Sequence, residues 1–367
     1  LLKDIKTNGA LKITGGLQAT SDPELVFKKF PNIDYLIMGE SEFVLKEFAD
    51  KIKSGNQISD INGSSYIKEK KIIINPKQKI IDSLDKFSPY NYDIFDDQVF
   101  FRPYNGEVVR GVDYELSRGC IYSCSYCVET VIQKYYGFEE SSSKTGAIKN
   151  FKSYLRNKSA NVIFDEITYL VKEKNINFIR CQDTNFLTND RKILMELANK
   201  IKKSDLNFRI YIETRPEGIN DLSIELLKDL KVDAVGMGIE LAGEDFREES
   251  LNRFASQEKT ILAFKLLKKN GIKRTSYNVI GFPDQNEESI LQTIEFNKLL
   301  NPDNITVAYY SPYVGTGQQK KGVDTETFSE YEFDADAALR SKSKSKELST
   351  EKLDYYKQNF VNLSRAW

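Results

Sequence analysis

From Asp113 onward the chain alternates short apolar segments with longer amphipathic ones, and this alternation limits the folds open to it. Each short segment has the length of a buried strand, and the longer ones repeat apolar residues at helical spacing. Strands that alternate with helices favour a parallel sheet, and six such units predict a partial (β/α) barrel. We predict its six strands at residues 114–119, 176–183, 208–216, 232–240, 274–283 and 305–312.

The segments between these strands carry signals of helix faces and helix ends. Apolar residues recur on one face of 163–171, and a second helix is expected after Asp190. A third follows Ser256, a residue type that caps helix N-termini, and ends before Gly271. The connection after the first strand is the longest and holds a serine-rich tract at 141–146, so we expect an extended loop there.

The N-terminal part repeats strand, glycine and helix on a smaller scale. Strand-like segments lie at 11–16 and 33–42, and the apolar strand of the second ends in Gly39. Helical segments follow them, at 22–30 and up to about Ile52. This order is typical of a doubly wound parallel sheet. It is too short for a whole Rossmann-like domain, so we expect a truncated start. Residues 53–112 show no sustained helical period and are predicted to be a connector.

Three cysteines directly follow the first predicted barrel strand. Cys120, Cys124 and Cys127 lie within eight residues, at the strand end where parallel barrels place their active sites. Three such thiolates can bind three irons of a cubane and leave the fourth iron open, whereas the usual site has four cysteines. A zinc site would need four ligands, and only the distant Cys181 could complete one. Unrelated buried cysteines are the other alternative, but a polar, glycine-led loop is poor core material.

The composition excludes several classes of chemistry and of partner. The chain contains no histidine, which removes imidazole zinc sites, Ser-His and Cys-His pairs and histidine bases. Its formal net charge of −1 offers no electrostatic reason to bind nucleic acid. No apolar run approaches the length of a membrane span. Thiolates, carboxylates, lysines, tyrosines or a cofactor must therefore carry any chemistry.

The spacing C-x3-C-x2-C inside SRGCIYSCSYC (117–127) resembles the signature of the radical S-adenosylmethionine superfamily. The resemblance implies a 4Fe–4S cluster whose open iron chelates the amino and carboxylate groups of S-adenosylmethionine. It implies that S-adenosylmethionine is cleaved reductively to methionine and a 5′-deoxyadenosyl radical, which abstracts hydrogen from a substrate. It also implies a flavodoxin- or ferredoxin-type electron donor and, because such a cluster is oxygen-sensitive, an anaerobic or well-reduced cytoplasm.

Further matches to this superfamily fall at successive strand ends. The resemblance assigns an aromatic contact with adenine to Tyr126, although simple loop packing would also explain it. Asp183 is the polar candidate for the methionine amino group, because Gln182 stands where the family has an acid; a turn or cap role competes equally. Cys181 is expected to be a buried, inert thiol. The remaining candidates are Arg215 for the carboxylate, Glu240 for the ribose, and Asn278 and Gly281 of NVIGFP for the adenine side.

The segment TGGLQATSDPELVFKKFPNIDYLIMGESE (14–42) resembles the back half of the cobalamin-binding domain that precedes the barrel in one branch of the superfamily. Gly15, Gly16 and Gly39 match strand-end glycines that lie against the corrinoid; an ordinary turn is the alternative. The branch often has histidine where Gln18 stands. The resemblance implies a cobalamin part (1–52), a connector (53–112), a barrel (113–316) and a C-terminal extension (317–367).

The resemblance implies a cobalamin-dependent radical methyltransferase, with the substrate left open. A non-methylating enzyme similar to the anaerobic cyclase of magnesium-protoporphyrin ester is the runner-up. A methylthiotransferase acting on tRNA is less favoured, because that family has a second cysteine trio near its N-terminus and this chain has none there. A non-catalytic carrier or sensor of a corrinoid or cluster is the alternative from another class, and the intact cysteine trio argues against it.

Overall fold

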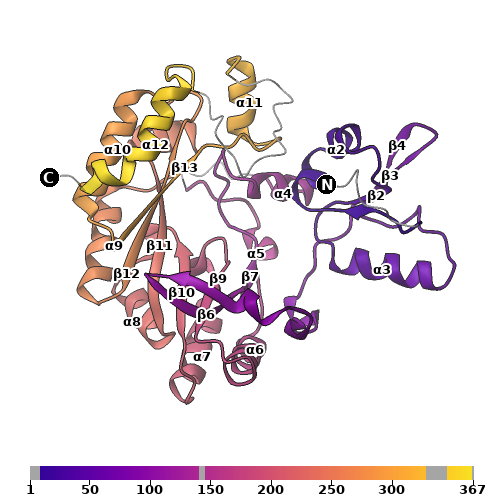
Figure 1. Cartoon of the computed structure of the whole chain (residues 1–367), viewed down its shortest axis with the longest axis horizontal. Helices are drawn as coiled ribbons and strands as arrows, with labels where there is room; N and C mark the ends of the chain where they lie inside the picture. Colours follow the sequence, from indigo (N-terminus) through magenta and orange to yellow (C-terminus); the bar gives the residue numbers. More distant parts are fainter. Residues whose placement is uncertain (1–8, 140–144, 328–344, 366–367) are drawn as a thin grey trace.

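The computed structural model describes residues 9–139, 145–327 and 345–365, and it contains two main sheets (Figure 1). Most of the serine-rich tract at 141–146 lies outside the described residues. The larger sheet has seven strands in the order β13-β12-β11-β10-β9-β6-β5. Its strands are β5 (Phe101–Tyr104), β6 (Glu107–Tyr114), β9 (Phe178–Cys181), β10 (Arg209–Thr214), β11 (Val232–Glu240), β12 (Lys273–Ile280) and β13 (Asn304–Tyr309).

The six strands from β6 to β13 run parallel, so the predicted partial barrel is confirmed. The main apolar core lies between this sheet and its crossover helices, since their amphipathic faces supply most of its members. These helices are α6 (Ala160–Glu173), α7 (Arg191–Lys202), α8 (Asp221–Asp229), α9 (Gln257–Lys269) and α10 (Glu287–Leu300). The last helix, α12 (Thr350–Arg365), packs on α10 and β13.

The first barrel strand lies earlier than the sequence predicted. Strand β6 ends at Tyr114, whereas the prediction placed the strand at 114–119. Asn105 and Gly106 form the two-residue loop of a β5–β6 hairpin and both have positive φ, at 49° and 84°. Asn-Gly is the strongest short-range hairpin signal, and this hairpin extends β6 toward its N-terminus and adds β5 as an antiparallel edge strand.

A two-stranded ribbon leads from the barrel into the cysteine loop. Strand β7 (Ser117–Arg118) pairs antiparallel with β8 (Arg156–Asn157), so that Arg118 stands opposite Arg156. The loop then enters α4 (Glu129–Tyr135), and a short helix, α5 (Phe151–Tyr154), leads back to β8. The cysteines are therefore carried by a separate ribbon rather than by the end of a barrel strand.

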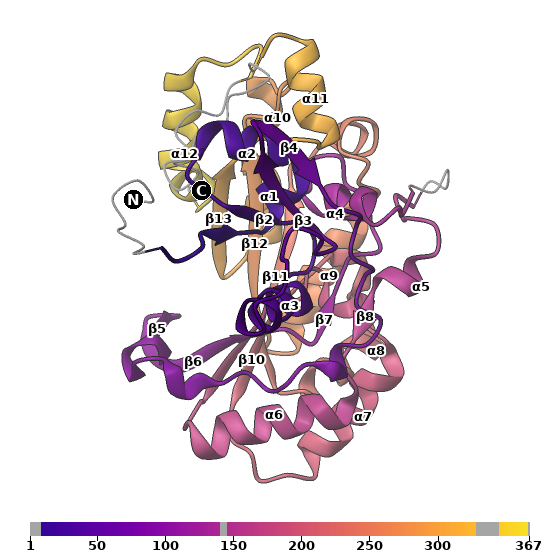
Figure 2. The ribbon, with the colours of Figure 1, turned by 90° about the vertical axis from the view of Figure 1, so that its right-hand side faces the viewer.

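The N-terminal unit, defined here as β1 to β4 with α1 to α3, forms the second sheet. Strands β1 (Ile13–Thr14) and β2 (Tyr35–Ile37) are parallel, and β3 (Ser64–Lys68) and β4 (Lys71–Ile74) continue the sheet antiparallel. Its helices are α1 (Leu17–Ser21), α2 (Pro23–Lys29) and α3 (Glu42–Lys53). In Figure 1 the unit lies on the side of the large sheet away from α8, α9 and α10, and Figure 2 shows it in front of the barrel strands.

The segment 53–112, predicted to be a connector, contributes to both sheets. It supplies β3 and β4 to the N-terminal unit and β5 and most of β6 to the large sheet. Within the described residues, no helix combines the length and the apolar character that crossing a bilayer requires.

Candidate functional site

The three predicted cluster cysteines lie on one largely buried loop between β7 and α4. Cys120 and Cys124 are each 7% exposed, and Cys127 is half-buried. Burial raises the pKa of the Cys120 thiol to about 12 and raises that of Cys127 as well, so both thiols are protonated in the protein alone. Iron binding would deprotonate them and release protons.

The donor set fits a cubane better than a single metal ion. In the part of the chain that the structure describes, no three His, Cys, Asp or Glu side chains converge on one ion position. In a cubane each thiolate binds its own iron, so three thiolates on one loop do not need a common centre. Cys181 takes no part, because it is 1% exposed in the core between sheet and helices.

The cysteine loop is held from three directions. Gln133 of α4 donates its side-chain amide to the carbonyl oxygens of Cys120 and Tyr122, both at 2.9 Å. On another side the backbone N–H of Ser125 donates to Leu251 O at 2.9 Å. From α11 (Gly317–Asp324), the backbone N–H of Gln318 donates to Ser125 O at 2.9 Å. Such a loop is preorganised before any cluster assembles.

Gln133→Met is expected to lower iron retention and the melting temperature. Methionine keeps most of the volume but leaves two loop carbonyls without a donor, at about 1–3 kcal/mol for each buried group. The measurement is iron per chain after anaerobic reconstitution, together with thermal unfolding. Gln292→Met, on the exposed face of α10, is the matched control and should retain wild-type iron. Wild-type retention by Gln133→Met would contradict a holding role for this amide.

Arg215 lies beside the cysteine loop, at the end of β10. Its Nη1 is 3.9 Å from Cys124 Sγ, and its guanidinium lies 3.8 Å from the ring centroid of Tyr122. Its Nε and Nη2 donate to Glu217 Oε1 at 3.0 and 2.6 Å. The arginine predicted to contact the methionine carboxylate is thus adjacent to the loop that would hold the cluster.

A second group gathers at the ends of β11 and β12. The Tyr126 ring meets Phe282 edge-on with centroids 5.8 Å apart, and Phe282 stacks on Tyr310 at 5.0 Å. Gly281 has a φ of 86°, and its N–H donates to Gln285 Oε1 at 2.6 Å. The structure therefore brings Tyr126 next to the glycine turn that the sequence predicted for the adenine side.

Glu240 and Arg253 form a buried pair near Tyr126. Arg253 Nη2 is 3.8 Å from Glu240 Oε1, and Arg253 is 4% exposed. Glu240 has a φ of 63°, a left-handed conformation that is uncommon for a glutamate and is often found at functional sites. The Nε of Arg253 is buried and has no hydrogen-bond partner within the part of the chain that the structure describes. Arg253 was not among the predicted site residues, because one arginine in an irregular segment carries no periodic or motif signal.

Two predicted residues are engaged by the protein itself. Asp183 is 2% exposed and accepts hydrogen bonds from Ser117 Oγ, from Leu116 N at 3.2 Å and from Asn189 Nδ2 at 3.1 Å. Burial raises the pKa of its carboxyl group. Asn278 accepts from Asn297 of α10 at 2.8 Å. These contacts favour roles in joining elements over the predicted contacts with S-adenosylmethionine.

The predicted corrinoid glycines have structural reasons of their own. Gly16 has a φ of 91° and precedes α1, and a Cβ on Gly15 would lie 3.1 Å from Ile37 O. Gly39 has a φ of 76°, and a Cβ there would clash with the Tyr136 hydroxyl group. Gly39 is thus required for the close approach of the N-terminal unit to α4. These contacts neither need nor exclude a corrinoid.

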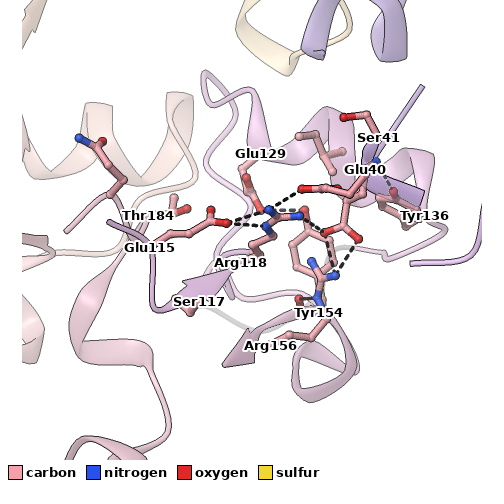
Figure 3. Close-up of a pocket in the computed structure, with 15 residues that line it drawn as sticks. Glu40, Ser41, Glu115, Ser117, Arg118, Glu129, Tyr136, Tyr154, Arg156 and Thr184 are labelled. Atoms are coloured by element: carbon pink, nitrogen blue, oxygen red, sulfur yellow. Dashed lines mark hydrogen bonds and ion pairs between the residues drawn. The ribbon is translucent and has the colours of Figure 1, made fainter. Parts of the chain in front are cut away.

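Glu40 ties the N-terminal unit to the ribbon before the cysteines (Figure 3). Both of its carboxylate oxygens accept from Arg156 Nη1, at 2.8 and 2.9 Å, and Arg118 Nη1 lies 3.6 Å away. Its backbone N–H donates to the Tyr136 hydroxyl group at 2.8 Å. Two arginines opposite each other on a ribbon repel, so the carboxylate between them stabilises the ribbon.

A pocket of about 330 Å³ opens at this junction (Figure 3). Its size is at the lower end of small-molecule sites. It is lined from three sides: the N-terminal unit, both flanks of the cysteine loop, and the segment after β9. The lining includes Gly39, Glu40, Glu42, Glu115, Arg118, Gly119, Glu129, Tyr154, Arg156, Gln182 and Thr184.

Comparison with known proteins gives relatives of low identity. The chain is 26% identical over 319 residues to an uncharacterized methyltransferase of Pyrococcus horikoshii, covering 86% of this chain and 63% of the relative. It is 24% identical over 360 residues to the anaerobic magnesium-protoporphyrin IX monomethyl ester cyclase of Rubrivivax gelatinosus, covering 95% and 60%. The chain therefore spans about three fifths of the length of these curated relatives.

Solved structures share the fold. The radical S-adenosylmethionine methyltransferase TsrM from Kitasatospora setae, with cobalamin and a 4Fe–4S cluster bound, matches with a TM-score of 0.65 at 18% identity, over 86% of this chain and 58% of that one. The cobalamin-dependent S-adenosylmethionine radical enzyme OxsB matches with a TM-score of 0.58 at 16% identity, over 86% and 42%. Residues 114–296, which contain the cysteine loop and most of the barrel, match the family described as the Radical SAM superfamily. With its barrel and its cysteine spacing, this chain belongs to the radical SAM superfamily.

Proposed function

We propose that Cys120, Cys124 and Cys127 bind a 4Fe–4S cluster that cleaves S-adenosylmethionine, and that the chain uses it in cobalamin-dependent methyl transfer. Membership of the superfamily supports the cluster and S-adenosylmethionine. The methyltransferase name of one relative and the fold shared with TsrM and OxsB support the transfer. An external electron donor of flavodoxin or ferredoxin type completes the proposal.

The chain's own residues would bind and orient the reactants. A reduced cluster would supply the electron that cleaves the sulfonium into methionine and a 5′-deoxyadenosyl radical. Tyr126 and Phe282 present aromatic surface for the adenine, and Glu240 presents a carboxylate for ribose hydroxyl groups. Arg215 presents a guanidinium for the methionine carboxylate beside Cys124. The burial of Phe282, Glu240 and Arg215 would limit the access of water to a reactive radical.

The observation that carries the cobalamin part is the junction at Glu40. The N-terminal unit, which resembles half of a cobalamin-binding domain, is joined by ion pairs to Arg118 and Arg156. Arg118 is two residues before Cys120, so the two units meet directly at the proposed cluster loop. A bound cobalamin would relay methyl groups from S-adenosylmethionine to the substrate.

Ring closure of the anaerobic cyclase type is the second candidate function. It is favoured by the match to the Rubrivivax gelatinosus cyclase, which extends over 95% of this chain and includes the N-terminal unit. In that case cobalamin would be bound but no methyl group would reach a substrate. The two candidates share the cluster and the cleavage of S-adenosylmethionine.

Incubation with methyl-deuterated S-adenosylmethionine distinguishes the candidates without a known substrate. The reconstituted chain, a low-potential reductant and hydroxocobalamin are combined anaerobically, and deoxyadenosine and corrinoid are analysed by mass spectrometry. Methyl transfer predicts deuterated methyl in the corrinoid fraction, and cluster chemistry predicts deoxyadenosine. Deoxyadenosine without corrinoid labelling would overturn methyl transfer and favour ring closure. Absence of deoxyadenosine from a chain with a full cluster would overturn the enzymatic proposal and favour a carrier.

A further inference from the structure

The structure leaves the amino group of S-adenosylmethionine without its expected partner. The sequence pointed to Asp183, but that carboxylate already accepts hydrogen bonds from Ser117, Leu116 and Asn189. All three donors belong to the protein, and they tie the end of β9 to the ribbon strand β7 and to the turn before α7. A carboxylate used in this way has little capacity left for a ligand, so another acceptor is needed near Cys124.

Glu217 supplies an unused acceptor at the required place. It lies in the single turn Pro216–Gly218 that follows β10, and its side chain is 17% exposed. Oε1 accepts two hydrogen bonds from Arg215, at 2.6 and 3.0 Å. Oε2 is buried and has no hydrogen-bond partner among the described residues. A buried carboxylate oxygen without a donor is costly, so this position favours a hydrogen-bond donor supplied by a bound ligand.

The position of Glu217 relative to the cysteine loop limits what that donor can be. The guanidinium that holds Oε1 also approaches Cys124 Sγ to 3.9 Å, so one arginine links Glu217 to a proposed cluster ligand. The residue therefore lies in the immediate surroundings of the cluster loop, where the open iron would chelate the methionine end of S-adenosylmethionine. An amine chelated to that iron keeps N–H groups that can donate to a carboxylate.

We propose that Glu217 Oε2 accepts a hydrogen bond from the amino group of S-adenosylmethionine, in the role that the sequence suggested for Asp183. This inference rests on the proposed cleavage of S-adenosylmethionine at Cys120, Cys124 and Cys127. The Arg215–Glu217 pair then presents a donor for the carboxylate and an acceptor for the amine of the same ligand. The methionine end is recognised from β10 instead of from β9.

Glu217→Gln tests this contact selectively, because Arg215 can donate only to an oxygen. The glutamine oxygen must take the place of Oε1, so the glutamine NH₂ group occupies the position of Oε2. There it would face the amino group of S-adenosylmethionine, and both groups are hydrogen-bond donors. Arg215 keeps its hydrogen bonds while the proposed contact with the amine is lost. Glu217→Asp, which retains the charge on a shorter side chain, is the second variant if Glu217→Gln fails to retain its cluster.

The experiment measures dissociation constants of S-adenosylmethionine and of its desamino analogue by anaerobic equilibrium dialysis, with iron content as the check on folding. We expect Glu217→Gln to weaken binding of S-adenosylmethionine about tenfold or more. Binding of the desamino analogue should be the same, within about twofold, in the variant and the wild type. Glu295→Gln on the exposed side of α10 is the matched control and should bind both ligands as the wild type does.

Three outcomes would overturn the inference. Equal weakening of both ligands would mean that Glu217 acts only by positioning Arg215. Unchanged binding of both would mean that a water molecule satisfies Oε2. Selective loss of the amino-group contribution in Asp183→Asn but not in Glu217→Gln would return the role to Asp183. None of these outcomes contradicts the proposed function, which fails separately if the wild-type chain with a full cluster releases no deoxyadenosine.

Discussion

Cys124→Ala is expected to abolish both cluster assembly and the release of deoxyadenosine. Cys124 is 7% exposed on the loop between β7 and α4, and its sulfur lies 3.9 Å from Arg215 Nη1. Removing one of three thiolates leaves two irons of a cubane without protein ligands, and no fourth cysteine lies near the loop to replace it. Iron and sulfide per chain, the charge-transfer absorbance and deoxyadenosine should all fall to background.

Cys181→Ala is the matched control for this experiment. Cys181 is 1% exposed in the apolar core, on the helix side of the sheet, and the substitution should cost about 1 kcal/mol of stability. Cluster content and deoxyadenosine release should stay at wild-type levels. Full cluster content in Cys124→Ala, or its loss in Cys181→Ala, would contradict the assignment of the ligands.

Arg156→Met is expected to destabilise the junction between the N-terminal unit and the cysteine ribbon by about 3 kcal/mol. The side chains of Arg156 and Glu40 are 7% and 11% exposed, so removing the arginine leaves a nearly buried carboxylate without its main partner. Arg156 also donates to Ile81 O at 2.8 Å and to Tyr154 O at 3.0 Å. Amide hydrogen exchange at residues 39–42 and 154–158 should accelerate, and urea unfolding should begin earlier.

A double-variant cycle identifies the cause of that loss. Glu40→Gln combined with Arg156→Met removes the unpaired charge, so the double variant should recover part of the stability lost in Arg156→Met. Lys46→Met is the surface control, because Lys46 and Asp50 are 70% and 62% exposed and such a pair contributes less than about 1 kcal/mol. Additive losses in the cycle would show that Glu40 and Arg156 are not coupled.

Much of the fold could be predicted because its strands and helices follow from the local spacing of apolar residues and from helix caps. The parallel strands from β9 to β13 and the helices after Asp190 and Ser256 lie where alternating apolar patterns and caps predicted them. The β5–β6 hairpin was the main error in the barrel. Its Asn105-Gly106 turn is a local hairpin signal, but it lies within the segment 53–112 that was predicted to be a connector.

The site was predictable only in part, because tertiary contacts determine which side chains already have hydrogen-bond partners within the protein. Asp183 and Glu217 are both acids after a barrel strand, and the sequence offers no reason to prefer the second. The structure gives a reason to prefer Glu217, since Ser117 and Asn189 donate hydrogen bonds to Asp183. Oε2 of Glu217, in contrast, has no partner among the described residues. Arg253 was missed for the same reason: its proximity to Glu240 depends on the path of an irregular segment.

The sequence alone determined the superfamily, the parallel barrel and the cysteine trio, because ligand spacing and apolar periodicity are properties of neighbours along the chain. The tertiary structure decided how the trio is presented. It placed the cysteines on the loop that follows the β7–β8 ribbon and held that ribbon to the N-terminal unit through Glu40. It also set Arg215, which is hydrogen-bonded to Glu217, beside Cys124. The pairings of Glu40 with Arg156 and of Arg215 with Cys124 join residues many positions apart, and their energies depend on burial, which no local pattern contains.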